Sequence, residues 1–246
     1  MKLRRVLGWI SLSIPLVAIL ALAVGYWRSD NECGKAAVPA VPTKAITYCD
    51  YGTADVLRLE DVEKPVPGDN ELLVRVHAAG VNPLDWHYMR GTPYLMRLSS
   101  GLRKPKDTRL GVDYAGTVEA VGRNVTRFKP GDQVFGGRSG ALAQYVVAKQ
   151  DGAVALKPAN VSFEQAGAVA IAATTALQGL RDAGRLEAGD RVLINGASGG
   201  VGTFAVQIAK SMGAEVTAVC STRNVGLVRA LGADHVVDYT RDDYTS

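Results

Sequence analysis

The stretch that decides the fold is RVLINGASGGVGTFAVQIAKSMGAEVTAVC, residues 191–220. Its first apolar run, at 192–194, is typical of a strand that is buried on both faces. A glycine-rich turn at 196–202 follows, and then a helical pattern with apolar residues at 201, 204, 205 and 208, which Gly213 ends. A second apolar run at 216–220 completes the predicted strand–turn–helix–strand unit.

The glycine-rich turn has the spacing of a dinucleotide-binding site. Ala197, Gly199 and Gly202 form the pattern A-x-G-x-x-G, in which an alanine replaces the usual first glycine. Such glycines let backbone N–H groups approach a pyrophosphate at the positive end of the helix dipole, and the last one lets the helix pack close to the strand. An ordinary loop is the alternative for the string alone, but the flanking strands and helix favour nucleotide binding.

The end of the second predicted strand indicates which dinucleotide is bound. Sites for NAD usually carry Asp or Glu there, which binds the ribose hydroxyls. The chain instead has Ser221-Thr222-Arg223-Asn224, with no acid and one cation. This suits the 2′-phosphate of NADP(H). The alternative is that Arg223 only solvates the start of a helix.

The N-terminal segment 1–28 has the pattern of a membrane anchor. Residues 6–27 form an uncharged, mostly apolar run of 22 residues behind a basic start. As a helix this run would be about 33 Å long, enough for a hydrocarbon core of ~30 Å. It predicts a single-pass transmembrane helix in the lipid bilayer. A signal peptide cleaved after 21–23 is the alternative, which the apolar residues beyond that site disfavour.

The side of the membrane stays open at this point. The basic start predicts that the N-terminus lies inside and the rest of the chain outside, whereas NADPH is a cytosolic reagent. If the chain is exported, Cys33 and Cys49 could form a disulfide.

Charge argues against a nucleic-acid partner. The chain has 28 Lys and Arg residues and 24 Asp and Glu residues, a net charge of +4. The whole excess lies in residues 1–28, so the remainder is electrically balanced and lacks the basic patch of a nucleic-acid-binding protein. Residues 29–43 are small, polar and proline-bearing, as in a linker.

Short predicted strands follow the linker. They lie at 72–76, 114–122, 133–137 and 143–148, with glycine and proline turns between them. This spacing predicts a small, mostly antiparallel barrel. From Ser162 the apolar period becomes helical, which places a domain boundary near Asn160.

Six blocks in this order resemble the zinc-free medium-chain dehydrogenases/reductases of the quinone oxidoreductase-like group. They are AAGVNPLDWHYMRG (78–91), LGVDYAGTVEAVG (110–122), KPGDQVFG (129–136), AATTALQGL (172–180), NGASGGVGTFAVQIAKSMGAEV (195–216) and LGADHVVDY (231–239). The resemblance implies a GroES-like β-barrel catalytic domain at 44–160 and a Rossmann NADP-binding domain at 161–246. A complete sheet of that kind needs three more strands after 235–239, so we expect the chain to be a fragment.

The resemblance also implies site residues. Those expected to hold NADP(H) are Thr175, Ala197, Ser198, Gly199, Gly200, Val201, Gly202, Ser221, Arg223, Asn224 and Tyr239. Those expected at the reacting centre are Asn82, Asp85 and Tyr88. Asp85 or Tyr88 would assist proton delivery, with a purely bracing role as the equal alternative.

Zinc ligands are replaced where the zinc-dependent relatives have them. Asn82 stands at a cysteine position and Val112 at a histidine position. The three cysteines cannot form an all-cysteine tetrahedral site, and we expect Cys220 to behave as a small buried hydrophobe. The three histidines, at 77, 87 and 235, are scattered, so we expect surface or packing roles and no metal.

The resulting functional hypothesis is a zinc-independent oxidoreductase. It would transfer hydride from NADPH to a quinone or an α,β-unsaturated carbonyl. Two alternatives stay open: a zinc-free alcohol dehydrogenase or ketone reductase, and a non-catalytic NADP-binding module that senses redox state. A homodimer is compatible with either.

Overall fold

The computed structural model describes residues 38–242, together with residues 17, 20, 23, 24, 26 and 33. The chain divides into two compact units, Met1–Gly167 and Ala168–Ser246. Each unit has its own sheet and its own hydrophobic core. The boundaries expected at 28, 43 and 160 stay predictions.

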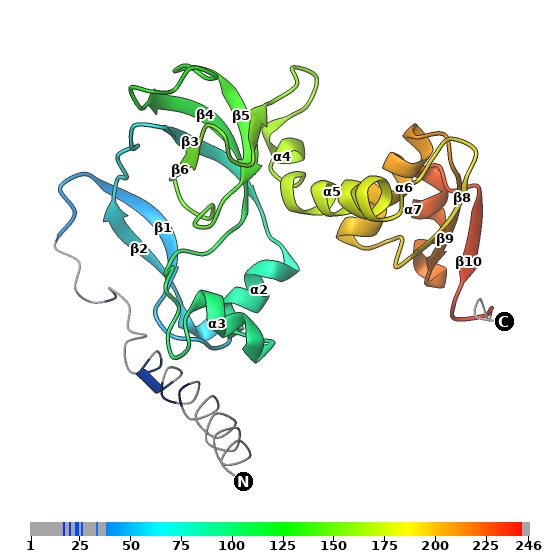
Figure 1. Ribbon diagram of the computed structural model, residues 1–246, viewed down its shortest axis with the longest axis horizontal. Coiled ribbons are helices and arrows are strands. Elements are labelled where there is room, and N and C mark those ends of the chain that lie inside the picture. The colour runs from blue at the N-terminus through cyan, green and yellow to red at the C-terminus, as the bar shows by residue number, and fades with distance from the viewer. Residues whose placement is uncertain are drawn as a thin grey trace, which may run out of the picture. The chain divides into compact units, whose positions relative to one another are not determined.

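The N-terminal unit is built around a curled, five-stranded antiparallel sheet (Figure 1). Its order is β6-β3-β4-β5-β7, and its strands are β3 (Glu71–Gly80), β4 (Asp113–Val121), β5 (Gln133–Gly137), β6 (Tyr145–Lys149) and β7 (Val154–Leu156). Four of them correspond to the four predicted strands. The turn before β5 contains Gly131 with φ +92°, a backbone conformation that favours glycine.

A two-stranded sheet of β1 (Pro42–Tyr48) and β2 (Leu57–Glu63) lies beside the larger sheet. Along its other edge, β1 donates from Ile46 N–H to Leu142 O (2.8 Å) and from Tyr48 N–H to Thr108 O (2.9 Å). Two register shifts in β3, next to residues 74 and 77, are irregularities of the kind that bend a strand. The curl encloses a core formed by Leu72, Val74, Tyr114, Val118, Phe128, Val134, Ala141, Val146, Ala148 and Val154.

Helices follow β3 in the N-terminal unit. Helix α2 (Pro83–Arg90) begins with a proline, whose fixed φ suits the first helical position, and ends at Gly91 with φ +60°. Between residues 38 and 167 the remaining helical turns are η1 (Ala54–Val56), η2 (Tyr94–Met96), α3 (Arg97–Ser100) and α4 (Phe163–Ala166). Thus α2 comes directly after a buried strand, which places residues 82–88 beside the sheet.

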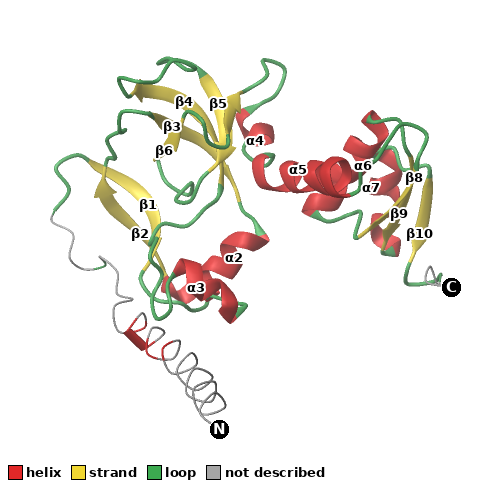
Figure 2. Ribbon diagram, in the orientation of Figure 1, coloured by secondary structure: helices red, strands yellow, loops and turns green. Residues whose placement is uncertain are grey.

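The C-terminal unit alternates strands and helices (Figure 2). Strands β8 (Arg191–Asn195), β9 (Glu215–Cys220) and β10 (His235–Asp238) form a parallel sheet of order β10-β9-β8. The helical elements are α5 (Ala170–Leu177), η3 (Gln178–Ala183), α6 (Gly200–Ser211), η4 (Thr222–Asn224) and α7 (Val225–Ala230). The predicted strand–turn–helix–strand unit is therefore present as β8, α6 and β9.

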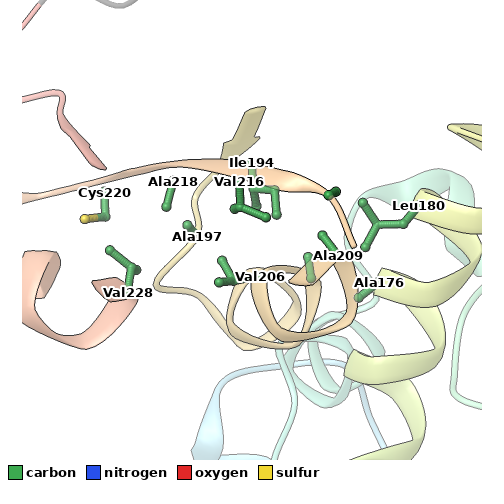
Figure 3. Packing of buried hydrophobic residues seen from close by; sticks show 12 residues of the cluster. Ala176, Leu180, Ile194, Ala197, Val206, Ala209, Val216, Ala218, Cys220 and Val228 are labelled. Atoms are coloured by element: carbon green, nitrogen blue, oxygen red, sulfur yellow. The ribbon is translucent and has the colours of Figure 1, made fainter. Parts of the chain in front are cut away.

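Small residues let α6 pack closely on this sheet. The buried positions of α6 are Gly202, Ala205, Val206 and Ala209, each one residue later than a position predicted for its apolar stripe. The expectation was wrong for Val201, which is 41% exposed, because its neighbour Gly202 faces the turn instead, where a Cβ would lie 2.2 Å from Gly196 O. Figure 3 shows Val206 and Ala209 facing Ile194, Val216 and Ala218.

Strand β8 is an end strand of the described sheet. It pairs with β9 on one side, and no strand among residues 38–242 pairs with its other side. Leu193 in β8 is 53% exposed. This edge therefore presents unpaired backbone groups next to an apolar side chain.

The predicted membrane anchor is contradicted by the helices of the structure. No helix in the described part of the chain is long and apolar enough to cross a bilayer. The longest of these helices, α6, has 12 residues, whereas a span needs about 20 apolar residues. The predicted single-pass membrane localisation is therefore wrong. Most of the run 6–27 itself lies outside the described residues.

A disulfide joins Cys33 to Cys49, the residue after β1. Their Cα atoms are 5.7 Å apart, within the usual range for a disulfide. The two cysteines named by the sequence as a candidate pair are thus bonded to each other.

Candidate active site and cofactor site

The start of α6 leaves backbone donors free at the glycine-rich turn. The first hydrogen bond of the helix runs from Thr203 N–H to Gly199 O (2.9 Å), so the amides of residues 200–202 come before the helical ladder. Gly199 offers no capping side chain, and the first turn contains no acid. The N-terminus of α6 is therefore a suitable position for an anion.

Two glycines of this turn differ in what surrounds them. A Cβ on Gly202 would lie 2.2 Å from Gly196 O and 2.7 Å from Ala197 Cα, which real structures do not tolerate. A Cβ on Gly200 would meet no atom within 4 Å other than those of its chain neighbours and of its own helix backbone. Gly202 is therefore needed for packing, while Gly200 borders open space at the amides.

Three polar side chains join the glycine-rich turn to the end of β9. Asn224 donates from Nδ2 to Ser198 Oγ (3.0 Å) and to Ser221 Oγ (3.2 Å). All three are half-buried. Ala197 is fully buried in the core and donates its N–H to Val219 O (3.0 Å), which fixes the turn against β9. The structure thus brings together the residues expected on both sides of the adenosine.

Arg223 and Tyr239 lie at the same end of β9. Arg223 is exposed and forms no ion pair within residues 38–242. Tyr239 is 55% exposed, and its N–H donates to Cys220 O (3.2 Å). Both side chains are free to meet a ligand beside Ser221.

An acid that the sequence did not single out lies nearby. Asp238, at the end of β10, accepts hydrogen bonds from Thr222 Oγ1 (2.5 Å), Thr240 Oγ1 (2.7 Å) and Thr240 N–H (3.1 Å). The hydrogen bond from Thr222 makes the largest contribution to lowering the pKa of this carboxyl below its usual value. Its charge is satisfied inside the protein, which leaves the end of β9 without an unpaired acid among the described residues.

Thr175 is exposed on α5, and its Oγ1 donates to Ile171 O (2.7 Å). Its proton is used within the helix, so the hydroxyl offers only acceptor lone pairs to a ligand. Thr175 belongs to the C-terminal unit, as do the glycine-rich turn and the end of β9.

In the N-terminal unit, two buried carboxylates hold Asn82. The N–H of Asn82 donates to Asp85 Oδ2 (2.7 Å), and its Nδ2 donates to Asp113 Oδ2 (3.2 Å). Asp85 and Asp113 are 3% and 1% exposed. The orientation of the Asn82 amide is therefore fixed, because the bond to Asp113 identifies the nitrogen. Sequence reasoning missed Asp113, although an acid within the apolar block at 110–122 was a signal.

The environment of Asp85 raises the pKa of its carboxyl above the usual value. Burial raises the pKa of the Asp85 carboxyl, and the charge of Asp113 raises it further, against the opposing effect of the Asn82 and Gly111 amides. Its Oδ1 has no hydrogen-bond partner within the described chain. A buried carboxyl with one unpaired oxygen can carry a proton at that atom.

Tyr88 of α2 lines a cavity of about 190 Å³ in the N-terminal unit. Tyr48 and Gly111 also line it, and burial, followed by the charge of Asp107, raises the pKa of Tyr48. Since Gly111 also faces Asp85 through its amide, the cavity adjoins the network of Asn82, Asp85 and Asp113. The three predicted reacting residues thus share one region.

The histidines and the free cysteine have other partners. His77 bonds Thr117 Oγ1 and stacks on Phe163, His87 bonds Thr92 O, and His235 bonds Glu215 Oε1. Cys220 is buried in the core of the C-terminal unit. Within the described residues no group of three or more His, Cys, Asp or Glu side chains could hold a metal. The zinc-free expectation stays a prediction.

Comparisons with known proteins find similarity to dehydrogenases and other oxidoreductases. Residues 68–159 match the family model for the alcohol dehydrogenase GroES-like domain, and residues 200–246 match that for zinc-binding dehydrogenase. A chloroplastic quinone-oxidoreductase homolog from Spinacia oleracea is 42% identical over 205 residues, which are 79% of this chain and 60% of that protein.

Solved structures are similar as well. The quinone oxidoreductase from Coxiella burnetii superposes with a TM-score of 0.74 at 35% identity, covering 82% of this chain and 64% of that one. A mycobacterial protein complexed with NADPH gives a TM-score of 0.69 at 31% identity, covering 81% of this chain and 59% of that one. The chain spans about half to three fifths of the length of the curated relatives it matches.

Proposed function

The chain belongs to the medium-chain dehydrogenase/reductase family, in its quinone oxidoreductase-like group, and from this premise we propose that it forms part of an NADPH-dependent reductase. The acceptor is a quinone or an α,β-unsaturated carbonyl, and no zinc takes part. Both acceptors are conjugated carbonyls, which take up a hydride and a proton. The homodimer stays a prediction.

The observation that carries the proposal is the open start of α6. Free amides at residues 200–202, the missing side chain at Gly200 and the absence of an acid in the first turn fit a pyrophosphate. Residues 199–202 would hold this group by backbone donors, with Ser198 beside them. A dinucleotide fits this end of the sheet by the chemistry of its donors.

NADPH is preferred over NADH because the end of β9 offers donors and a free cation. Ser221, Asn224 and the exposed Arg223 would bind the 2′-phosphate, with Tyr239 beside them. Asp238, whose carboxylate is held by Thr222 and Thr240, does not compete for the ribose. A phosphate at this position gains charge-assisted hydrogen bonds.

When bound, NADPH would supply the hydride. The chain's own residues then have to orient the acceptor and deliver one proton. Asn82 has a fixed amide whose second Nδ2–H is not used by Asp113, and this donor would orient a carbonyl oxygen. The proton comes from Asp85, through its unpaired Oδ1, or from the Tyr88 hydroxyl in the cavity.

Zinc is not required in this mechanism. Asn82 and Val112 stand where the zinc-dependent relatives would have their ligands, and neither an amide nor a valine is a zinc ligand of the usual kind. Asn82 instead uses its side chain to bond Asp113. Elemental analysis of protein that is active should therefore find no stoichiometric zinc, and chelators should leave the rate unchanged.

The test measures cofactor binding and turnover separately on the full chain. Fluorescence titration should give tighter binding of NADPH than of NADH, and Gly200→Val should strongly weaken the binding of both. NADPH consumption is then followed with a quinone, an enone and a simple ketone, with Gly226→Val as the control, because Gly226 also has open space around it but lies on α7.

The outcomes separate the alternatives. Consumption with the quinone or the enone supports the proposal. Oxidation of an alcohol with NADP instead would assign a zinc-free alcohol dehydrogenase. Tight NADPH binding without turnover, in this chain and in a longer form of the protein, would favour a binding module.

A further inference from the structure

The cavity beside Tyr88 is suited to a small acceptor. Its volume of about 190 Å³ is somewhat larger than the ~150 Å³ of an engineered cavity that binds benzene. It has room for one six-membered ring or a short enone. Tyr88 and Gly111 connect it to the network that holds Asn82 and Asp85.

Two cations line this cavity, and neither is neutralised by an ion pair. Lys106 and Arg109 both contribute to its wall, and neither forms a salt bridge within residues 38–242. The one acid of the wall, Asp107, accepts the backbone N–H of Arg109 on its Oδ1 (3.2 Å). The cavity therefore carries a net positive charge.

Backbone contacts anchor the loop that carries the two cations. The N–H of Lys106 donates to Ser100 O (2.8 Å), and Arg109 forms an isolated bridge to Thr47 of β1. Ser100 lines the same cavity. The charges are thus presented by a loop that is anchored at both ends, which lowers the entropy cost of binding.

We propose that this cavity binds an acceptor that carries a carboxylate, with its ring or enone beside Tyr88 and its carboxylate on Lys106 and Arg109. The inference rests on the proposed function, because it assigns the substrate class of the same site. Arg109 has the planar donor group that carboxylates accept bidentately, and Lys106 adds a second charge. A neutral ring would leave both cations without a partner.

The test compares two stable probes that differ in one group. These are hydroquinone and 2,5-dihydroxybenzoate, which is hydroquinone with a carboxylate. Calorimetric titration of the full chain should give at least about tenfold tighter binding of 2,5-dihydroxybenzoate than of hydroquinone. A difference of about tenfold is the contribution expected from one charge-assisted hydrogen bond. The preference should shrink as salt is added, since the loop is open to solvent.

Matched variants show which charges are responsible. Arg109→Met and Lys106→Met remove the charge but keep an unbranched apolar side chain, and each should reduce the preference for the acid by at least about fivefold. Lys129→Met removes one exposed charge of the same unit outside the cavity and should leave the preference unchanged. Circular dichroism of each variant checks that it is folded.

Equal affinity for the two probes, no binding of either, or an undiminished preference in both cavity variants would overturn the inference. NADPH binding is measured in the same samples. If NADPH binds and the acid is not preferred, this inference fails while the proposed function stands. If the acid is preferred and NADPH does not bind, the cavity assignment stands and the proposed reductase fails.

Discussion

The two candidate functional regions differ in the groups that form them: backbone amides in one and side chains in the other. In the C-terminal unit the start of α6 offers backbone amides, and the side chains around them are absent or small. In the N-terminal unit Asn82 is held by two buried carboxylates, so side chains make the site. A backbone site keeps its donors when neighbouring side chains are replaced, whereas a side-chain site can change its chemistry with one substitution.

The largest expected effect separates a proton-delivering role from a bracing role in the N-terminal unit. If Asp85 delivers the proton, Asp85→Asn should lower kcat by about 100-fold or more, the usual contribution of a general acid. Tyr88→Phe should then have a small effect. The reverse order would assign the proton to Tyr88.

Steady-state kinetics with saturating NADPH measures both variants. Equal, less than fivefold losses in both would show that the two residues only brace α2. This result would remove the contrast between the two regions, since neither side chain would then take part in the chemistry.

The next largest expected effect is on cofactor affinity, and it is tested by substituting the two glycines of the backbone site separately. Gly200→Val fills the open space at the amides, so NADPH affinity should fall by at least about 50-fold, the value of one to two charge-assisted hydrogen bonds. Gly202→Ala places Cβ 2.2 Å from Gly196 O and should destabilise the C-terminal unit by about 1–3 kcal/mol.

The two variants should thus fail in different ways. Urea unfolding followed by circular dichroism should show near-native stability for Gly200→Val and reduced stability for Gly202→Ala. Unchanged NADPH affinity in a folded Gly200→Val protein would mean that the turn is an ordinary loop.

The next effect concerns cofactor choice. Ser221→Asp combined with Arg223→Ala introduces an acid and removes the free cation at the end of β9. NADPH affinity should fall by about tenfold, while NADH affinity stays the same or improves. Fluorescence titration with both cofactors measures this. Equal losses for both would place the 2′-phosphate elsewhere.

The smallest effect is on stability and comes from the buried acid. Because the pKa of Asp85 is raised in the folded protein, the folded state binds this proton more tightly than the unfolded chain does. Stability from this group is therefore present at acidic pH and is lost as the pH rises through the raised pKa. The free energy of unfolding of Asp85→Asn should exceed that of the native protein by about 1 kcal/mol at neutral pH. At acidic pH the two proteins should be equally stable.

Asp234→Asn provides the control of opposite sign. The hydrogen bond from Lys210 lowers the pKa of Asp234, so its contribution appears as the pH rises and the variant should lose stability at neutral pH. Trp86 lies on α2, so tryptophan fluorescence follows unfolding of the N-terminal unit, and circular dichroism follows both. A native-like pH dependence in Asp85→Asn would contradict the raised pKa.

The C-terminal unit was the more predictable part. Apolar runs at 192–194 and 216–220 and the glycines between them depend on local periodicity and turn chemistry, and the structure has β8, α6 and β9 there. The error in the stripe of α6 arose because apolarity was weighed without size: Val201 is exposed while Gly202 is buried. Close packing selected the smaller residue.

The candidate active site was predictable only in part. Asn82, Asp85 and Tyr88 were expected from a local motif, and they lie together. Asp113 is 31 residues from Asn82 along the chain, so only the pairing of β3 with β4 brings the two together. Lys106 and Arg109 lie in a loop, where no periodicity indicates which side chains meet in a cavity.

The unpaired edge of β8 has a practical consequence for handling this chain. Among the described residues no strand pairs with this side of β8, and half-exposed Leu193 lies in its middle. Such an edge can pair with an extended strand of another molecule. Self-association of the purified polypeptide should therefore increase with its concentration. Light scattering should rise at lower protein concentration when the salt concentration is high, because salt screens the charge repulsion between molecules. Leu193→Lys would place a positive charge on this edge strand and should reduce self-association.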